Sequence, residues 1–212
     1  MGNYTDFLTP QNSLLALIDY QPAMFFGVQS HDRMLITHNA QILAKTAKLF
    51  NLPTVLSTVA KDSFSGELVT QIASLFPGQE IIDRTSMNAW LSKEFRDAVV
   101  STGRKKIVVA GLWTEACVLF VALELLKKGY EVYVPTDACG DVSEEAHERS
   151  VQRMIQAGAV SITSLQFLFE LQQDWARSDT YDGVIEILEA DSPYGIQVRF
   201  SKWALGEHAS EA

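Results

Sequence analysis

The chain has 212 residues, of which 47% are hydrophobic and 20% are charged, and its formal net charge at pH 7 is -9. This length and composition are typical of one globular domain with a full hydrophobic core. The negative charge argues against nucleic acid or an anionic membrane as a partner, because both select for basic patches. Two cysteines are too few for a disulfide framework, the first residues do not resemble a signal peptide, and no apolar run is long enough to cross a bilayer, so we expect a cytoplasmic protein.

Short apolar runs alternate with longer amphipathic segments along the chain. We predict strands at 14–18, 54–58, 80–82, 107–110, 131–134 and 159–162, and helices at 34–50, 66–76, 89–101, 116–128 and about 141–157. Several of the strands are apolar at every position, as in parallel strands buried between helical layers. The alternation predicts a doubly wound, Rossmann-like, three-layer α/β/α fold with a six-stranded parallel sheet.

Three of the predicted helices begin at a capping side chain. Asp32 can cap the helix at 34–50 and Asn88 the helix at 89–101, and Asp141 with Glu144 has the spacing of a capping box.

Residues 178–212 break the alternation and are rich in aromatic side chains, among them Tyr194, Phe200 and Trp203. We therefore predict a domain at 1–177 and an extension at 178–212 that packs either on this domain or on a neighbouring subunit.

The segment from Ile107 to Cys117 is the most informative part of the sequence. An apolar strand is followed by Gly111, which permits a sharp turn, and by Thr114, which can cap a helix with Cys117 in its first turn. Unpaired amides and the helix dipole would favour the thiolate form of Cys117, which is the reactive form. The alternative is that Cys117 is a buried thiol that only packs.

Polar side chains also follow the other predicted strands. Asp19 ends the first strand, Asp83 and Arg84 follow the third, and Asp137 and Cys139 follow the fifth. Ligands of parallel sheets bind at the carboxyl ends of the strands, so these groups are expected near Cys117. A thiol, a carboxylate and a fixed cation at one edge can support nucleophilic catalysis.

These residues resemble those of the isochorismatase-like cysteine hydrolase superfamily. The resemblance is carried by Asp19 with Gln21, the turn from Gly111 to Cys117, Thr136-Asp137-Ala138 and Gln156-Ala-Gly158-Ala159, and runs from about residue 13 to residue 170. The segments 50–53, 88–90 and 170–175 are most similar to the YcaC-like branch.

The resemblance implies Cys117 as the nucleophile and Asp19 as general base and acid. Arg84 stands where most of the superfamily has a lysine, and its role would be electrostatic, because arginine does not exchange protons near neutral pH. The family also has a cis peptide before the nucleophile, here between Leu112 and Trp113, which would direct the amides of Trp113 and Cys117 at an oxyanion.

A metal-independent hydrolase of a small amide, ureido or related C–N substrate, working without a cofactor, is the implied activity. The zinc-binding histidines of the nicotinamidase branch are missing from 60–66, so we expect no metal. True isochorismatases lack the nucleophilic cysteine. The family further implies a higher homo-oligomer, a tetramer or an octamer.

Other interpretations remain open at this stage. A redox protein could pair Cys117 with Cys139, and a catalytically silent scaffold could keep the fold alone. Four aromatic residues could line a substrate pocket or belong to the core: Phe25, Phe26, Trp90 and Trp113.

Overall fold

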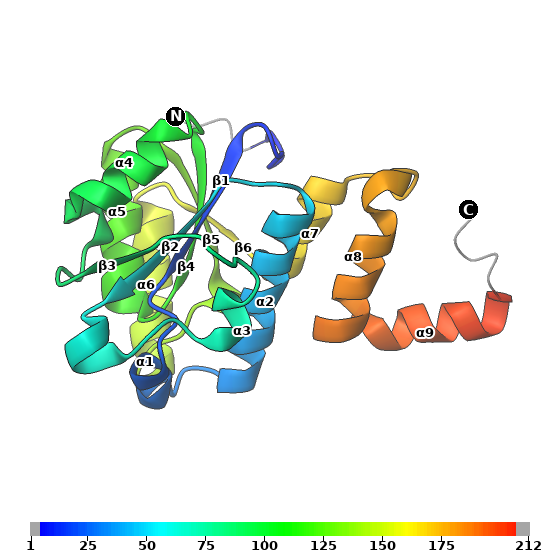
Figure 1. Ribbon diagram of the computed structural model, residues 1–212, viewed down its shortest axis with the longest axis horizontal. Helices are drawn as coiled ribbons and strands as arrows, with labels where there is room; N and C mark the ends of the chain where they lie inside the picture. The colour runs from blue at the N-terminus through cyan, green and yellow to red at the C-terminus, as the bar shows by residue number, and fades with distance from the viewer. Residues whose placement is uncertain (1–4, 207–212) are drawn as a thin grey trace.

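The computed structural model describes residues 5–206 and shows one twisted parallel sheet between two layers of helices (Figure 1). Within these residues the six strands lie in the order β3-β2-β1-β4-β5-β6, and every pairing is parallel. The bounds are Ser13–Ile18 for β1, Thr54–Val59 for β2, Ile81–Arg84 for β3, Lys106–Gly111 for β4, Glu131–Pro135 for β5 and Val160–Ile162 for β6. The predicted fold class is confirmed.

Helices cover both faces of this sheet. The α-helices are α1 (Pro22–Gly27), α2 (Arg33–Leu49), α3 (Thr70–Ala73), α4 (Lys93–Ser101), α5 (Leu119–Lys127), α6 (Glu144–Gln156), α7 (Ser164–Gln172), α8 (Ser178–Asp191) and α9 (Tyr194–Leu205). Shorter turns are η1 (Lys61–Ser65), η2 (Ala89–Leu91), η3 (Thr114–Val118) and η4 (Thr136–Ala138). In Figure 1, α4, α5 and α6 lie on one side of the sheet and α2, α3 and α7 on the other. In the part of the chain from residue 5 to residue 206, no helix is long and apolar enough to cross a membrane.

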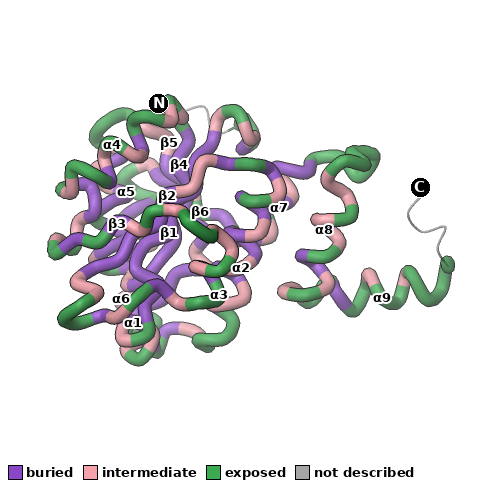
Figure 2. The backbone as a smooth tube through the Cα atoms, in the orientation of Figure 1, coloured by how far each residue is buried: buried purple, intermediate pink, exposed green. Residues whose placement is uncertain are grey.

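The central strands β1 and β4 form the middle of the core. Every residue of both strands is buried, and they pair along their whole length (Figure 2). Gly111 lies at the end of β4, where a Cβ atom would come within 2.0 Å of the Ile18 carbonyl oxygen. Only glycine fits between these strands, at the point where the chain turns toward Cys117.

The structure corrects several predicted helices. Asp32 caps α2 as predicted, but the predicted helix 66–76 shortens to α3. Asn88 caps only the short turn η2, and Ser92 caps α4. The predicted capping box of α6 is wrong, since Ser143 caps that helix and Asp141 binds elsewhere. In each case a nearby side chain or a tertiary partner competes for the same backbone amides.

Helices α8 and α9 form the extension. Helix α8 lies along α2, where Val184, Ile187 and Leu188 are buried and Lys45 Nζ lies 2.5 Å from Asp191 Oδ2. Helix α9 runs outward from the end of α8, and most of it is exposed (Figure 2).

Candidate active site

Asp19 is the first residue after β1 and is fully buried. Its backbone has a φ of 57°, in the left-handed region, which costs a non-glycine residue about 1–3 kcal/mol. Its amide donates to the Ser57 carbonyl oxygen at 2.9 Å, and its own carbonyl oxygen accepts from the Gln21 amide at 2.8 Å. Backbone strain held by the sheet in this way is frequent at functional sites.

Arg84 is paired with this carboxylate. Its Nη2 lies 2.8 Å from Asp19 Oδ2, and the two side chains are only 3% and 0% exposed. Arg84 is the last residue of β3 rather than part of a following loop. Asp83 points to other partners, because its Oδ1 accepts from the Thr58 hydroxyl at 2.9 Å, so it is not the ion partner of Arg84.

Cys117 lies beside the same carboxylate. It is 3% exposed and belongs to the π-helical turn η3, and the nearby Asp19 carboxylate raises the pKa of its thiol. The Oδ1 atom of Asp19 is buried without a hydrogen-bond partner among the described residues. The structure therefore brings Asp19, Arg84 and Cys117 together, as the strand ends predict.

The protonation of Cys117 differs from the sequence-based expectation. Burial, followed by the charge of Asp19 and its hydrogen bond, raises the pKa of the Cys117 thiol to about 12, although Arg84 and the Trp113 amide act in the opposite direction. The thiol is therefore favoured over the thiolate that the helix terminus alone would favour, because the loss of solvation opposes the charged form. At rest the site holds a thiol next to a carboxylate.

The cap of η3, the turn that carries Cys117, is also different from the prediction. Thr114 does not cap the helix; its hydroxyl donates to the Gly140 carbonyl oxygen at 3.1 Å. The carboxylate of Asp141 accepts from the Glu115 amide at 2.7 Å and takes the place of the cap. Asp141 is distant in sequence, so local spacing could not identify it.

Trp113 stands at the junction between β4 and η3. The peptide bond from Leu112 to Trp113 is cis, and the Trp113 backbone lowers the pKa of the Cys117 thiol. Its indole Nε1 donates to the Met24 carbonyl oxygen at 2.9 Å, and its ring lies against Gly27. Trp113 therefore borders the site through its backbone and joins it to α1.

The other three aromatic candidates lie in different surroundings. Phe25 is half-buried against Tyr20, with ring centroids 6.1 Å apart. Phe26 is 74% exposed and is not a pocket wall within one chain. Trp90 packs on Tyr130, which follows α5 at the end opposite Cys117, and its place in a substrate pocket stays a prediction. The residues around Trp90 in the sequence do not distinguish an aromatic side chain of the core from one that lines a pocket.

Two polar residues after β5 have structural partners. Asp137 accepts from the amide and the hydroxyl of Ser164 at 2.8 Å each, and so holds the start of α7. Cys139 is fully buried, its thiol lies 3.4 Å from the Pro135 carbonyl oxygen, and burial raises its pKa to about 12. Neither arrangement indicates a role in catalysis.

Sequence reasoning gave no role to two residues that shape the site. Gln21 is fully buried and ties the end of β2 to the following loop, with bonds to both backbone groups of Val59 and to the Gly66 carbonyl oxygen. His147 lies in α6 and bonds to Thr114. Among residues 5–206 there is no group of three or more His, Cys, Asp or Glu side chains that could hold a metal ion.

Comparison with known proteins agrees with this geometry. The model of the isochorismatase domain family matches residues 13–166. The chain is 35% identical over 169 residues to the probable hydrolase YcaC of Escherichia coli K12, covering 79% of this chain and 81% of that protein.

Two solved structures are similar over nearly the whole chain. The Escherichia coli YcaC gene product, described as an octameric hydrolase of unknown specificity, has a TM-score of 0.90 and 32% identity and covers 97% of this chain and 100% of its own. YcaC from Pseudomonas aeruginosa, solved with hexane-2,5-diol and covalent acrylamide, has a TM-score of 0.89 and 31% identity. This match covers 95% of our chain and 98% of the Pseudomonas aeruginosa chain.

Proposed function

Since the chain belongs to the isochorismatase family and is a hydrolase of that family, we propose that it is a metal-independent cysteine hydrolase of small amide, ureido or related C–N substrates. The observation that carries this proposal is the Cys117 thiol against the buried Asp19–Arg84 pair. A buried ion pair at the end of two strands adds little to stability by itself, so its place beside a thiol favours a chemical role.

The reaction begins with a proton transfer. The carboxylate of Asp19 accepts the thiol proton while the sulfur of Cys117 attacks the substrate carbonyl carbon. The C=O electrons move to oxygen, and the amides of Trp113 and Cys117 are the donors available to the resulting oxyanion. Arg84 remains charged and holds the carboxylate in place.

The same carboxyl group then acts as an acid. Protonated Asp19 delivers its proton to the nitrogen of the leaving ammonia or amine as the C–N bond breaks, which leaves a thioester on Cys117. Water, deprotonated by Asp19, cleaves the thioester to the acid product and restores the thiol. No step requires a preformed thiolate, which fits the raised pKa of Cys117.

The experiment is a hydrolysis assay on a panel of small primary amides, ureido compounds and carbamoyl compounds. Release of ammonia is measured for wild type, Cys117→Ala and the matched variant Cys139→Ala. We expect the wild type and Cys139→Ala to hydrolyse at least one class, and Cys117→Ala to be slower by about a thousandfold or more. Equal rates in wild type and Cys117→Ala would contradict the proposal.

We also propose that the chain forms a higher homo-oligomer, a tetramer or an octamer, in which α9 lies against a neighbouring subunit. Ile196, Phe200 and Trp203 share one face of α9 and are 78%, 62% and 80% exposed. Apolar faces of this kind usually mark an interface, and the similar Escherichia coli protein is described as an octamer.

The mass of the particle in solution tests this assembly. We expect multi-angle light scattering to give a tetramer or octamer for wild type and a smaller species for the double variant F200E/W203E. The control Gln197→Glu adds a charge at an exposed polar position of the same helix. A monomeric wild type, or a double variant of unchanged mass, would contradict the role of α9.

A further inference from the structure

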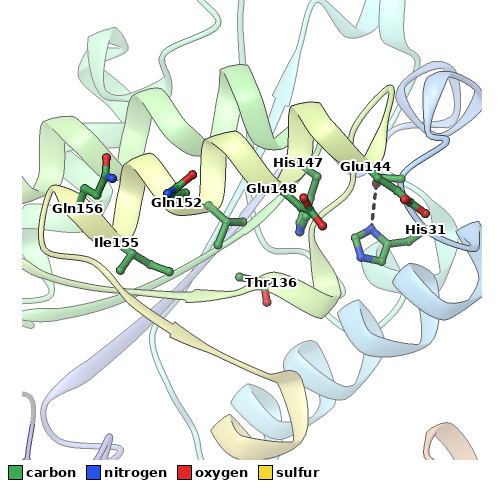
Figure 3. A pocket seen from close by; sticks show the side chains of 10 residues that line it. His31, Thr136, Glu144, His147, Glu148, Gln152, Ile155 and Gln156 are labelled. Carbon is green, nitrogen blue, oxygen red and sulfur yellow. Dashed lines mark hydrogen bonds between the residues drawn. The ribbon is translucent and has the colours of Figure 1, made fainter.

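A groove of about 810 Å³ lies beside α6, next to the nucleophile turn (Figure 3). Figure 3 shows His31, Glu144, His147 and Glu148 at one end of it and Gln152, Ile155 and Gln156 along the rest. His147 is the residue that connects this groove to the site. It is 7% exposed, and its ring meets the ring of His31 edge to face with centroids 4.6 Å apart.

The inner nitrogen of His147 is bonded to the nucleophile turn. Its Nδ1 lies 2.9 Å from the Thr114 hydroxyl oxygen. The hydroxyl is also bonded to the Gly140 carbonyl oxygen at 3.1 Å, and the donor and acceptor in its bond to His147 depend on the tautomer of the neutral ring. Burial and the neighbouring His31 lower the pKa of His147 to about 4, so the ring is neutral at physiological pH.

Thr114 in turn fixes the peptide unit that faces Cys117. The Thr114 amide donates to the Gly140 carbonyl oxygen at 3.0 Å, and the Trp113 carbonyl oxygen accepts from the amides of Ala116 and Val118. These two bonds close the turn that carries Cys117, and the Trp113 backbone lowers the pKa of the Cys117 thiol. A displacement of Thr114 would turn these groups away from the sulfur.

We propose that His147 is a positioning residue of the active site, which holds the Thr114 hydroxyl and through it the turn that carries Cys117. This proposal rests on the role of Cys117 proposed above. His147 bonds to Thr114 of this turn, so we expect its effect on the chemistry to pass through the turn. Displacements of the order of 1 Å in a catalytic group can lower rates by about a hundredfold.

The test measures acrylamide addition to Cys117 against pH, with the modified peptide identified by mass spectrometry. The variants are His147→Phe, which removes the ring nitrogen bonded to Thr114, and Thr114→Val, which removes the hydroxyl with nearly the same volume. Because the Trp113 amide lowers the pKa of Cys117, its displacement should move the midpoint of the profile to higher pH and slow addition at pH 8 by about tenfold.

Two further variants separate positioning from general damage. His147→Asn retains an N–H donor close to the position of Nδ1, and we expect it to restore most of the wild-type profile. Glu148→Gln changes an exposed residue of the same groove and should leave the profile unchanged. Melting temperatures show which variants are folded. If His147→Phe does not fold, Thr114→Val alone tests the proposal.

A folded His147→Phe or Thr114→Val protein with the wild-type profile would overturn the proposal, as would a His147→Asn protein as slow as His147→Phe. Failure of the proposed function has a different signature. In that case wild-type Cys117 does not react and Cys117→Ala hydrolyses as well as wild type, whatever the state of His147.

Discussion

Replacing Asp19 by asparagine is expected to remove hydrolysis while making Cys117 easier to alkylate. The variant has no base for the first proton transfer and no acid for the leaving nitrogen, so turnover should fall by about 10²- to 10⁴-fold. The charge of Asp19 and its hydrogen bond both raise the pKa of Cys117. Without them Arg84 is left facing the thiol, the pKa falls, and more thiolate is present at neutral pH.

The two rates are measured on the same preparations. Ammonia release reports turnover, and the second-order rate of acrylamide addition between pH 6 and pH 10 reports the thiolate. We expect the addition profile of Asp19→Asn to move to lower pH while its hydrolysis disappears. Asp83→Asn is the matched control, since Asp83 neighbours Arg84 but bonds to Thr58. Hydrolysis that survives in Asp19→Asn would contradict the assigned role, as would addition that slows together with hydrolysis.

Replacing Arg84 by methionine is expected to destabilise the fold at neutral pH. Methionine keeps the long apolar stem but removes the positive charge, which leaves the fully buried carboxylate of Asp19 without its counter-ion. Removing one partner of a buried ion pair typically costs about 3–5 kcal/mol in the free energy of unfolding. Arg84→Lys keeps the charge and should recover most of this loss, with less exact geometry because lysine has no planar pair of donors.

The effect of Arg84→Met should depend on pH. Burial already raises the pKa of Asp19 above its usual value, and Arg84 opposes that rise. Without Arg84 the pKa of the folded state rises further. A raised folded-state pKa gives stability that is present below the unfolded-state pKa and is lost as the pH increases through the folded-state pKa. The difference between the variant and wild type should therefore be largest at pH 7 to 8 and smaller near pH 4.

Urea denaturation at several pH values measures this difference. The double variant with Asp19→Asn is the control, because it removes the buried charge together with its partner and should be more stable at pH 7 than Arg84→Met alone. A loss of stability in Arg84→Met that does not change between pH 4 and pH 8 would show that the carboxylate is not the cause.

The sheet and the three site residues could be predicted from the sequence because their signals are local. Runs such as Ile107–Ala110 are apolar at every position, and a polar residue directly after such a run must lie at the edge of the sheet. Asp19, Arg84 and Cys117 were found in this way, and the structure brings them within one cluster.

What could not be predicted depends on residues far apart in the chain. The cap of the nucleophile turn is Asp141, 26 residues after Glu115, and the partner of the Thr114 hydroxyl is His147, 33 residues away. Local spacing instead pointed to Thr114 as the cap. The protonation state of Cys117 differs from the prediction for a related reason. The helix terminus that favours the thiolate is visible in the sequence, whereas the burial that raises the pKa of the thiol is not.

The central claim is that Cys117 is the nucleophile, and the most direct measurement is peptide mapping after incubation with acrylamide, the reagent found covalently bound in the Pseudomonas aeruginosa relative. Trypsin separates the two cysteines, placing Cys117 in peptide 107–127 and Cys139 in peptide 129–149. The account predicts an adduct on peptide 107–127 alone, which is absent in Cys117→Ala and retained in Cys139→Ala. An adduct on peptide 129–149 in the folded protein, or on neither peptide, would contradict it.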